Sequence, residues 1–533
     1  MEKEMYLKPN VVFEPLIANW YAWAHLVSPA TAALNITGRY IPIIDSYLLD
    51  PSAHAEAVRN PKMLGGPFMD LNGEKEEEVR QLKKDILKSN DLLVNFSDAI
   101  RALDKMLSFE AKGYGLEGFY KKIPNILKGY VELYYDRNNN ADFRFIEPLL
   151  YKSKYYKKET QSIALWLTEN DKRPFCLSTP RFKDSKSVFL HLPFEDHRID
   201  ELVRMKKTPQ PPGYIKSLLN IPEADEIVFD TFFTEERPKE YKRYLGNKIR
   251  MRYFGHACIL IETKEISILI DPLISYYGYV SEVNHFSYED LPETLNYVLI
   301  THNHQDHVLF ETLLQLRSRI GTIIVPDSGG GRLEDPNLKL ILNNIGFNNV
   351  IPIKEMETIN FSDSTITGIP FTGEHSDLNI LTKTCYLVQI SKFKLLFLAD
   401  SRIVEPALYE HIQKEIGPVD VMFFGMECDG APLTWLYGPL MTKKITRDQD
   451  ASRRLAGSNF EEAFSLLKIF KPKEVYVYAM GQEPWLEYIS SVRYTDESNP
   501  IIQSNKLIEK CRELGLATER LFGEKEILYE RYN

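Results

Sequence analysis

The sequence predicts an α/β protein (α+β overall), with an α+β domain over residues 1–245 followed by a layered α/β domain over residues 246–533. Length is the first reason, because 533 residues exceed the size of one typical domain. The second is that short apolar runs alternate with helical stretches after residue 249. The third is that titratable residues directly follow several of these runs, as at strand ends in layered α/β domains.

Composition excludes several classes of protein. Lys and Arg number 65 against 75 Asp and Glu, and this net charge of −10 argues against a nucleic-acid partner. Five scattered cysteines without close pairs indicate reduced thiols. The first residues do not resemble a signal peptide, and no apolar segment reaches the ~20 residues needed to span a bilayer. We therefore expect a cytoplasmic protein without a membrane partner.

The N-terminal domain contains no cluster of residues that predicts catalysis. Its aromatic opening, residues 13–47, predicts an irregular packed segment. Residues 74–107 predict a helix with one charged, solvated face. Three further ranges predict a hairpin and two strands: residues 129–150, 162–167 and 187–192. His191 and His197 lie beside acidic residues that predict a capped turn rather than a site.

The second domain opens with three closely spaced strands, residues 251–254, 258–262 and 266–270, which predict a meander at a sheet edge. The following runs predict the remaining strands: residues 322–325, 365–369, 386–390, 393–398, 421–424 and 475–478. Helices are expected over residues 309–320 and 405–416. This alternation predicts a layered domain with its site at the strand ends.

One stretch predicts a metal site. The buried strand expected at residues 297–301 runs directly into His302, His304, Asp306 and His307, the pattern His-x-His-x-Asp-His. His302 and His304 can direct two imidazoles at one point, while Asp306 and His307 turn toward a neighbouring point. Such spacing suits two metal ions roughly 3.5–4 Å apart.

Later strand ends offer further ligands. Glu374 and His375 follow the strand at 365–369, and Glu427 follows the strand at 421–424. Asp400 ends an apolar strand, where it is suited to bridge two cations. Three residues are expected to orient the metal ligands by hydrogen bonds: His256, Asp271 and His375.

The order of these elements resembles the metallo-β-lactamase fold over roughly residues 248–530, which implies an αββα sandwich with a dinuclear site at one edge. The sequence departs from the hydrolases of that fold, because no histidine follows the late strand at 475–478. After His375 the sequence contains only His411, within a helical stretch. A site rich in carboxylates favours iron or manganese over zinc, and carboxylate-rich iron pairs suit dioxygen activation.

Residues 425–439, which include Glu427, Trp435 and Tyr437, and residues 452–459 resemble the diiron β-hydroxylases of chloramphenicol biosynthesis. This resemblance implies a diiron monooxygenase of antibiotic biosynthesis that hydroxylates the β-carbon of an amino acid, most directly an aromatic one. It implies a substrate tethered as a thioester to the carrier domain of a nonribosomal peptide synthetase. Dioxygen and an external electron donor are also implied, as is a homodimer formed through the N-terminal domain.

By position, the resemblance places the ligands at His302, His304, Glu374, Asp306, His307, Asp400 and Glu427. We hypothesise that His302, His304 and Glu374 hold one iron. Asp306, His307 and Glu427 would hold the other, and Asp400 would bridge them. Glu374, Asp400 and Glu427 are the residues expected to take part in catalysis. The segment from Trp435 to Tyr437 is expected to shape the substrate pocket or the carrier-docking face.

Two alternatives remain open from the sequence. One is a dizinc hydrolase, a thioesterase or lactonase, in which His375 replaces Glu374 as a ligand. The two residues are adjacent, so their spacing does not decide between them. The other is a non-catalytic docking protein that retains an inactive site.

Overall fold

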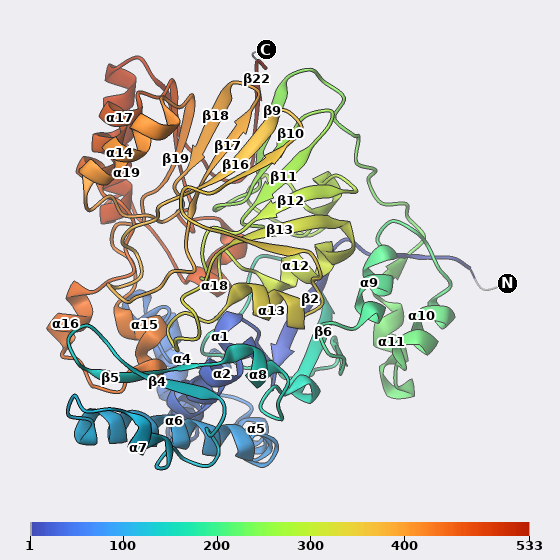
Figure 1. Ribbon diagram of the computed structural model, residues 1–533. Coiled ribbons are helices and arrows are strands. Elements are labelled where there is room, and N and C mark those ends of the chain that lie inside the picture. Colours follow the sequence, from blue (N-terminus) through green and yellow to red (C-terminus); the bar gives the residue numbers. More distant parts are fainter. Residues whose placement is uncertain (1–2, 532–533) are drawn as a thin grey trace.

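The C-terminal part of the protein is a sandwich of two seven-stranded sheets. The computed structural model describes residues 3–531, and Figure 1 shows the sandwich above the N-terminal region. In spatial order, the first sheet comprises β14 (Val350–Ile353), β13 (Ile320–Pro326), β12 (Leu295–Leu299), β11 (Ser267–Ile270), β10 (Ile259–Glu262), β9 (Ile249–Tyr253) and β22 (Lys525–Tyr529). The second comprises β15 (Thr358–Phe361), β16 (Ser364–Ile369), β17 (Cys385–Ile390), β18 (Phe393–Phe397), β19 (Val421–Gly425), β20 (Glu474–Tyr478) and β21 (Ala517–Arg520).

Helices cover the outer face of each sheet. Helices α12 (Phe310–Leu316) and α13 (Leu338–Asn344) share a core with the outer face of the first sheet. Helices α14 (Pro406–Ile416), α17 (Phe460–Phe470) and α19 (Asn499–Glu513) share another with the second sheet. A third core fills the space between the sheets. Both faces of each sheet are therefore apolar, which explains the continuous apolar runs of the sequence and confirms the predicted αββα sandwich.

Alternate residues of one strand face different cores. In β11, Leu269 joins the core beneath α12, whereas Ile268 and Ile270 join the core between the sheets. The predicted antiparallel meander of β9, β10 and β11 is present. Its expected position at the sheet edge is wrong, because β22 pairs with β9 and forms the edge. The helix expected at 309–320 ends at Leu316, since Ile320 already begins β13.

The opening of the N-terminal region is regular, so the expectation of an irregular segment is wrong. It contains β2 (Val11–Ile17), β3 (Trp20–Tyr21), α1 (Ala24–Val27), α2 (Pro29–Asn35), the π-helix η1 (Ile36–Tyr40) and α3 (Ile41–Leu49). Every residue of β2 is buried, which leaves no polar–apolar alternation to mark the strand. Strand β2 pairs with β3 and with β6 (Gln161–Leu167), and β6 pairs with β7 (Val188–Leu190).

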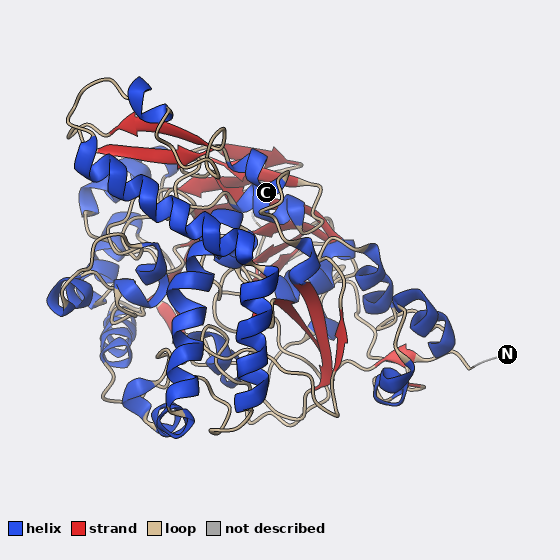
Figure 2. Ribbon diagram, turned by 90° about the horizontal axis from the view of Figure 1, so that it is seen from below, coloured by secondary structure: helices blue, strands red, loops and turns tan. Residues whose placement is uncertain are grey.

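The remaining N-terminal elements largely match the prediction. The hairpin consists of β4 (Val131–Tyr135) and β5 (Ala141–Phe145). The expected helix is two helices, α5 (Glu76–Ser89) and α6 (Asp91–Glu110), because Asn90 leaves helical geometry. Asp196 caps α9 (His197–Arg204) by accepting a hydrogen bond from the Arg198 amide. In the view from below, helices lie in front of most of the strands (Figure 2).

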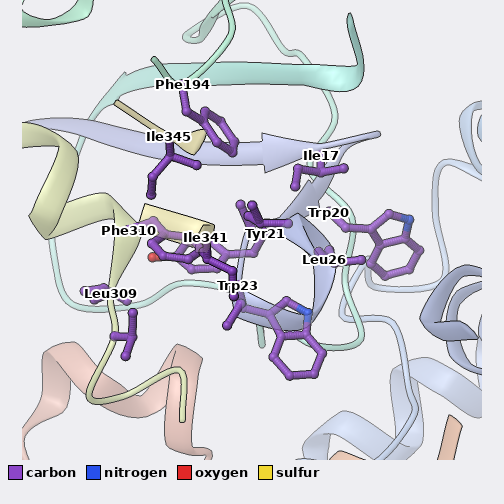
Figure 3. Close-up of a cluster of buried hydrophobic side chains, with 14 of the residues drawn as sticks. Ile17, Trp20, Tyr21, Trp23, Leu26, Phe194, Leu309, Phe310, Ile341 and Ile345 are labelled. Atoms are coloured by element: carbon purple, nitrogen blue, oxygen red, sulfur yellow. The ribbon is translucent and has the colours of Figure 1, made fainter. Parts of the chain in front are cut away.

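The N-terminal region and the sandwich share one hydrophobic core. Tyr21 and Trp23 belong to the same buried cluster as Phe310 and Ile341 from the α12–α13 layer (Figure 3). Because buried side chains from both regions pack together, separating them would expose apolar surface on each. The boundary near residue 245 remains a prediction. Among the described residues, no helix combines the length and apolar character that crossing a bilayer requires.

Buried charges also join the two regions. Arg173 contacts Glu14 at 2.7 Å and Glu311 of α12 at 2.9 Å, and Arg181 contacts Glu14 at 2.9 Å. Tyr21 donates a hydrogen bond of 2.8 Å to Glu311. We call Glu14, Arg173, Arg181 and Glu311 the boundary cluster. Of its ion pairs, Arg173–Glu311 joins the two regions, and the two pairs with Glu14 lie within the N-terminal region.

Candidate metal centre

The predicted site residues come together where strands of both sheets end. In the first sheet, β11 leads into Asp271 and β12 leads into the histidine motif. In the second, β18 leads toward Asp400 and β19 toward Glu427, while Glu374 follows β16. Strand β11 runs parallel to β12, and β18 runs parallel to β19, so each pair ends at the same edge of its sheet.

Asp271 fixes the orientation of His307. Its fully buried carboxylate lies 2.8 Å from His307 Nδ1 and accepts hydrogen bonds from the Thr301 amide and hydroxyl at 2.8 and 2.6 Å. The other ring nitrogen, Nε2, lies 3.1 Å from Asp400 Oδ2. Since Nδ1 donates to Asp271, Nε2 is the nitrogen that would bind a metal ion on the side of Asp400. Asp271 thus holds the ring of His307, and its role in orienting a metal ligand stays a prediction.

His302, His304 and Glu374 form one group of possible ligands. His304 Nδ1 lies 2.9 Å from Glu374 Oε1, and the rings of His302 and His304 are 4.7 Å apart. His375 lies behind Glu374, with Nδ1 2.8 Å from its other oxygen. Glu374 therefore contacts both His304 and His375, and the ring centroids of these two histidines are 4.6 Å apart.

A second group lies beside the first. His302 and His307, whose ring centroids are 4.0 Å apart, group with Asp400. His256 and Asp306 group with His307, and His256 Nε2 lies 3.3 Å from Asp306 Oδ2. His256 thus offers a nitrogen to Asp306 directly, a contact that the sequence did not indicate.

Glu427 lies outside these three groups of possible ligands, but the charges of Asp400 and Asp306 change its pKa. Burial and the nearby carboxylates of Asp400 and Asp306 raise the pKa of Glu427 well above its usual range. Burial alone would raise the pKa of Asp306, but His307 and His256 outweigh it and lower that pKa. The site therefore concentrates negative charge that the histidines only partly balance, an environment that favours cation binding.

The residues fit a pair of iron ions. Buried polar atoms normally have hydrogen-bond partners, yet His302 Nε2, Asp400 Oδ1 and His256 Nδ1 have none. His375 Nε2 also lacks a hydrogen-bond partner. Imidazole nitrogens and carboxylate oxygens together suit iron. Because these atoms converge on one place, bound metal ions would satisfy them.

Backbone strain is concentrated at the same site. His256, Asp271, Glu374 and Ala399 all have positive φ, at 50°, 40°, 61° and 46°. Residues with side chains adopt this conformation rarely and at a cost of about 1–3 kcal/mol each. The surrounding sheets enforce these conformations, which direct the side chains of three site residues into the centre.

Two residues at the site were not individually predicted. The Tyr437 hydroxyl lies 3.0 Å from His304 Nε2. His25 of α1 is 3% exposed, and its ring centroid lies 6.1 Å from that of Tyr437. Burial lowers the pKa of His25 to about 3, with His304 adding to the effect, so the ring is neutral at physiological pH. His25 belongs to no motif. Tyr437 lies in the stretch 425–439 that carries the resemblance, but it was expected at the pocket only as part of the segment 435–437.

Comparison with known proteins supports the resemblance seen in the sequence. Residues 6–238 match the diiron non-heme β-hydroxylase N-terminal domain, and residues 267–434 match the β-lactamase superfamily domain. A protein of Streptomyces venezuelae named 4-amino-L-phenylalanyl-[CmlP-peptidyl-carrier-protein] 3-hydroxylase is 36% identical over 524 residues, covering 97% of this chain and 98% of the relative.

Solved structures agree over the full length of the chain. The crystal structure of CmlA, a diiron β-hydroxylase from Streptomyces venezuelae, is 35% identical and superposes with a TM-score of 0.93, covering 99% of this chain and 100% of that one. A CmlA mutant gives a TM-score of 0.91 at 34% identity, covering 98% and 100%. The likeness thus includes the N-terminal region as well as the sandwich. This chain belongs to the family of diiron non-heme β-hydroxylases built on the metallo-β-lactamase fold.

Proposed function

We propose that this enzyme hydroxylates the β-carbon of an amino acid that is held as a thioester on the carrier domain of a nonribosomal peptide synthetase. The observation that carries the proposal is the 36% identity, over nearly the whole chain, to a relative named as a hydroxylase of a carrier-bound aminoacyl group. The amino acid is proposed to be aromatic, because the relative's name specifies a 4-amino-phenylalanyl group.

The chain offers ligands for two irons. His302, His304 and Glu374 would hold one ion, and Asp306, His307 and Glu427 the other, with Asp400 between them. His256, which faces Asp306, would orient that carboxylate. Once bound, the two irons would supply the reductive activation of dioxygen that hydroxylation of a C–H bond requires. The two electrons come from an external donor.

The residues around the ligands maintain their geometry. Asp271 and Thr301 hold His307 through hydrogen bonds, and Thr301 also contacts His302 Nδ1 at 3.0 Å. Glu374 is enclosed by His304 and His375, whereas Glu427 is partly exposed. We infer that Glu427 is the carboxylate with freedom to move when substrate arrives. The enclosed histidines exclude water from the metal side of the centre.

The dizinc hydrolase is less well supported. A hydrolase site would use His375 in place of Glu374, but His304 Nδ1 lies against Glu374 Oε1 at 2.9 Å. The pair of variants Glu374→Ala and His375→Ala tests this choice, since the proposal expects only the first to lose the metal ion bound by His302 and His304. The reverse result would identify His375 as the ligand.

The test of function is hydroxylation by the purified iron-loaded protein. About two irons per chain are expected, with incorporation of one oxygen atom from labelled dioxygen at the β-carbon of a carrier-loaded aromatic amino acid. Two zinc ions per chain together with thioester cleavage would contradict the proposal. The synthetase, the electron donor, the cytoplasmic location and the homodimer through the N-terminal region remain predictions.

A further inference from the structure

We propose that Tyr437 and Arg39 are positioning residues, which hold His304 in the tautomer that presents Nδ1 to the metal. Through Arg39, the N-terminal region would then take part in building the metal centre. This inference rests on the proposed diiron function. It concerns residues that lie outside the metal-binding motif.

The first step is the geometry of His304. Its Nδ1 lies 2.9 Å from Glu374 Oε1, and its Nε2 lies 3.0 Å from the Tyr437 hydroxyl. A neutral imidazole carries one proton, and a metal binds the nitrogen that lacks it. If Nε2 donates its proton to the tyrosine oxygen, Nδ1 keeps its lone pair on the side of Glu374. The hydroxyl of Tyr437 thereby selects the ligating atom.

The neighbouring histidines show why this selection matters. His302 and His307 place Nδ1 near Thr301, and in His307 Nδ1 also faces Asp271, so that both rings present Nε2 to the centre. His304 has the opposite arrangement, with Nδ1 inward and Nε2 outward. The motif thus needs a separate outer partner for His304. Tyr437 fills that position.

The second step is the support of Tyr437. This residue ends α15 (Leu433–Tyr437), a helix of five residues. So short a helix is not stable by itself in water. Its position must therefore come from tertiary contacts.

Some of those contacts come from the N-terminal region. Arg39 Nη2 donates hydrogen bonds to the carbonyl oxygens of Trp435 and Leu436 at 2.8 and 3.0 Å. A cation at the carbonyl end of a helix also interacts favourably with the helix dipole. The Trp435 indole in turn donates to the Gly65 carbonyl at 2.7 Å. Asp450 of α16 (Arg447–Ser452) also accepts hydrogen bonds from the Thr434 amide and hydroxyl at 2.9 and 2.6 Å. Both regions of the protein therefore hold α15.

Arg39 itself is held in place. It lies in the π-helix η1, and its Nε donates to Asn35 Oδ1 at 3.2 Å. Short π-helical segments occur frequently at functional sites. The buried His25 packs edge-on against Tyr437. Arg39 thus holds the backbone before Tyr437, and His25 contacts its ring.

Tyr437→Phe tests the first step, because it removes only the hydroxyl. The experiment follows the rate at which a chelator extracts iron from the loaded protein, together with the absorption spectrum of the diferric form. Loss of an orienting partner is expected to accelerate extraction by about 10-fold and to change the spectrum. Tyr40→Phe is the matched control: Tyr40 is fully buried, and its hydroxyl accepts a hydrogen bond from Trp23 rather than from a metal ligand. It should behave as the wild type.

Arg39→Met tests the second step and should reproduce the faster extraction and the altered spectrum. Arg39→Lys retains a cation that can donate hydrogen bonds, so its extraction rate and spectrum should lie between those of Arg39→Met and the wild type. This variant also keeps the test valid if Arg39→Met fails to fold. Wild-type extraction and spectrum in Tyr437→Phe would overturn the inference. A change in Tyr437→Phe with wild-type behaviour in both Arg39 variants would overturn the role of the N-terminal region. A wild-type protein that binds no iron would overturn the proposed function instead.

Discussion

The metal centre and the boundary cluster are both buried groups of charged residues, but they differ in how their charges are balanced. In the boundary cluster, Glu14 and Glu311 each contact a guanidinium group within 3 Å. In the metal centre, Asp400 Oδ1 and His302 Nε2 have no partner. Buried charges that are paired within the protein stabilise one arrangement. Arg173 Nε in the boundary cluster also lacks a hydrogen-bond partner, but in the metal centre such atoms belong to candidate ligands of one site, as expected where an ion binds.

The pKa values show the same difference. Burial would raise the pKa of Glu14, but Arg181 and Arg173 outweigh burial and lower it. For Glu427, burial and the charges of Asp400 and Asp306 act together and raise the pKa. One carboxylate is stabilised as an anion by the fold, whereas the other needs an added cation. The predictions that follow test this difference.

The largest effect is expected from Asp400→Ala. Removing the carboxylate between the two groups of ligands should abolish binding of the iron pair and lower hydroxylation by at least about 1000-fold, or about 4 kcal/mol. The fold should persist, because Asp400 has an unpartnered oxygen rather than a structural salt bridge. Metal analysis and circular dichroism check both parts. Retention of two irons with full activity would remove Asp400 from the ligand set.

Arg173→Met should have the opposite consequence. It leaves Glu14 and Glu311, each 2% exposed, without a shared cation, and breaking such a buried pair costs about 3–5 kcal/mol. Urea denaturation should therefore show a clear loss of stability. The iron content of the protein that remains folded should stay near the wild-type value. A loss of iron at unchanged stability would erase the distinction between the two clusters.

Glu147 offers an intermediate case, a buried carboxylate at the same boundary that accepts hydrogen bonds from the Asn337 amide. Burial raises its pKa from 4.5 to about 7. Because the folded-state pKa is raised, its contribution to stability is fully present below pH 4.5 and is lost as the pH rises through 7. Glu147→Gln should thus stabilise the protein at pH 8, by up to about 3 kcal/mol, and have little effect at pH 4.5. Equal effects at both pH values in urea denaturation would contradict this.

The smallest effect is expected from Thr301→Val, which removes the hydroxyl that donates to Asp271 and contacts His302 Nδ1 but removes no ligand. The lost hydrogen bonding should lower the free energy of iron binding by about 1 kcal/mol, and iron extraction should therefore be about fivefold faster. Thr312→Val is a matched control, since Thr312 is also fully buried but contacts Tyr288. Equal extraction rates in the two variants would show that Thr301 does not support the centre.

Sequence reasoning succeeded where the relevant signal is local. The histidine motif is contiguous, and Glu374, Asp400 and Glu427 each follow an apolar strand, so all could be named before their positions in space were known. It failed for β2, because a strand buried on both faces shows no alternation. Tyr437 contacts His304 across 133 residues of sequence, and Arg39 contacts Trp435 and Leu436 across 396 and 397. No local pattern marks such contacts. The assignment of ligands to individual irons remains a prediction.

The position of β22 has a consequence for synthesis of the chain. The other six strands of the first sheet lie between Ile249 and Ile353, but β22 begins only at Lys525. While the ribosome translates the intervening residues, one edge of β9 stays unpaired. Unpaired strand edges can form hydrogen bonds with other chains, which leads to aggregation. The last strand to emerge therefore closes the first sheet. A nascent chain stalled before residue 525 would be more prone to aggregate than its length alone suggests.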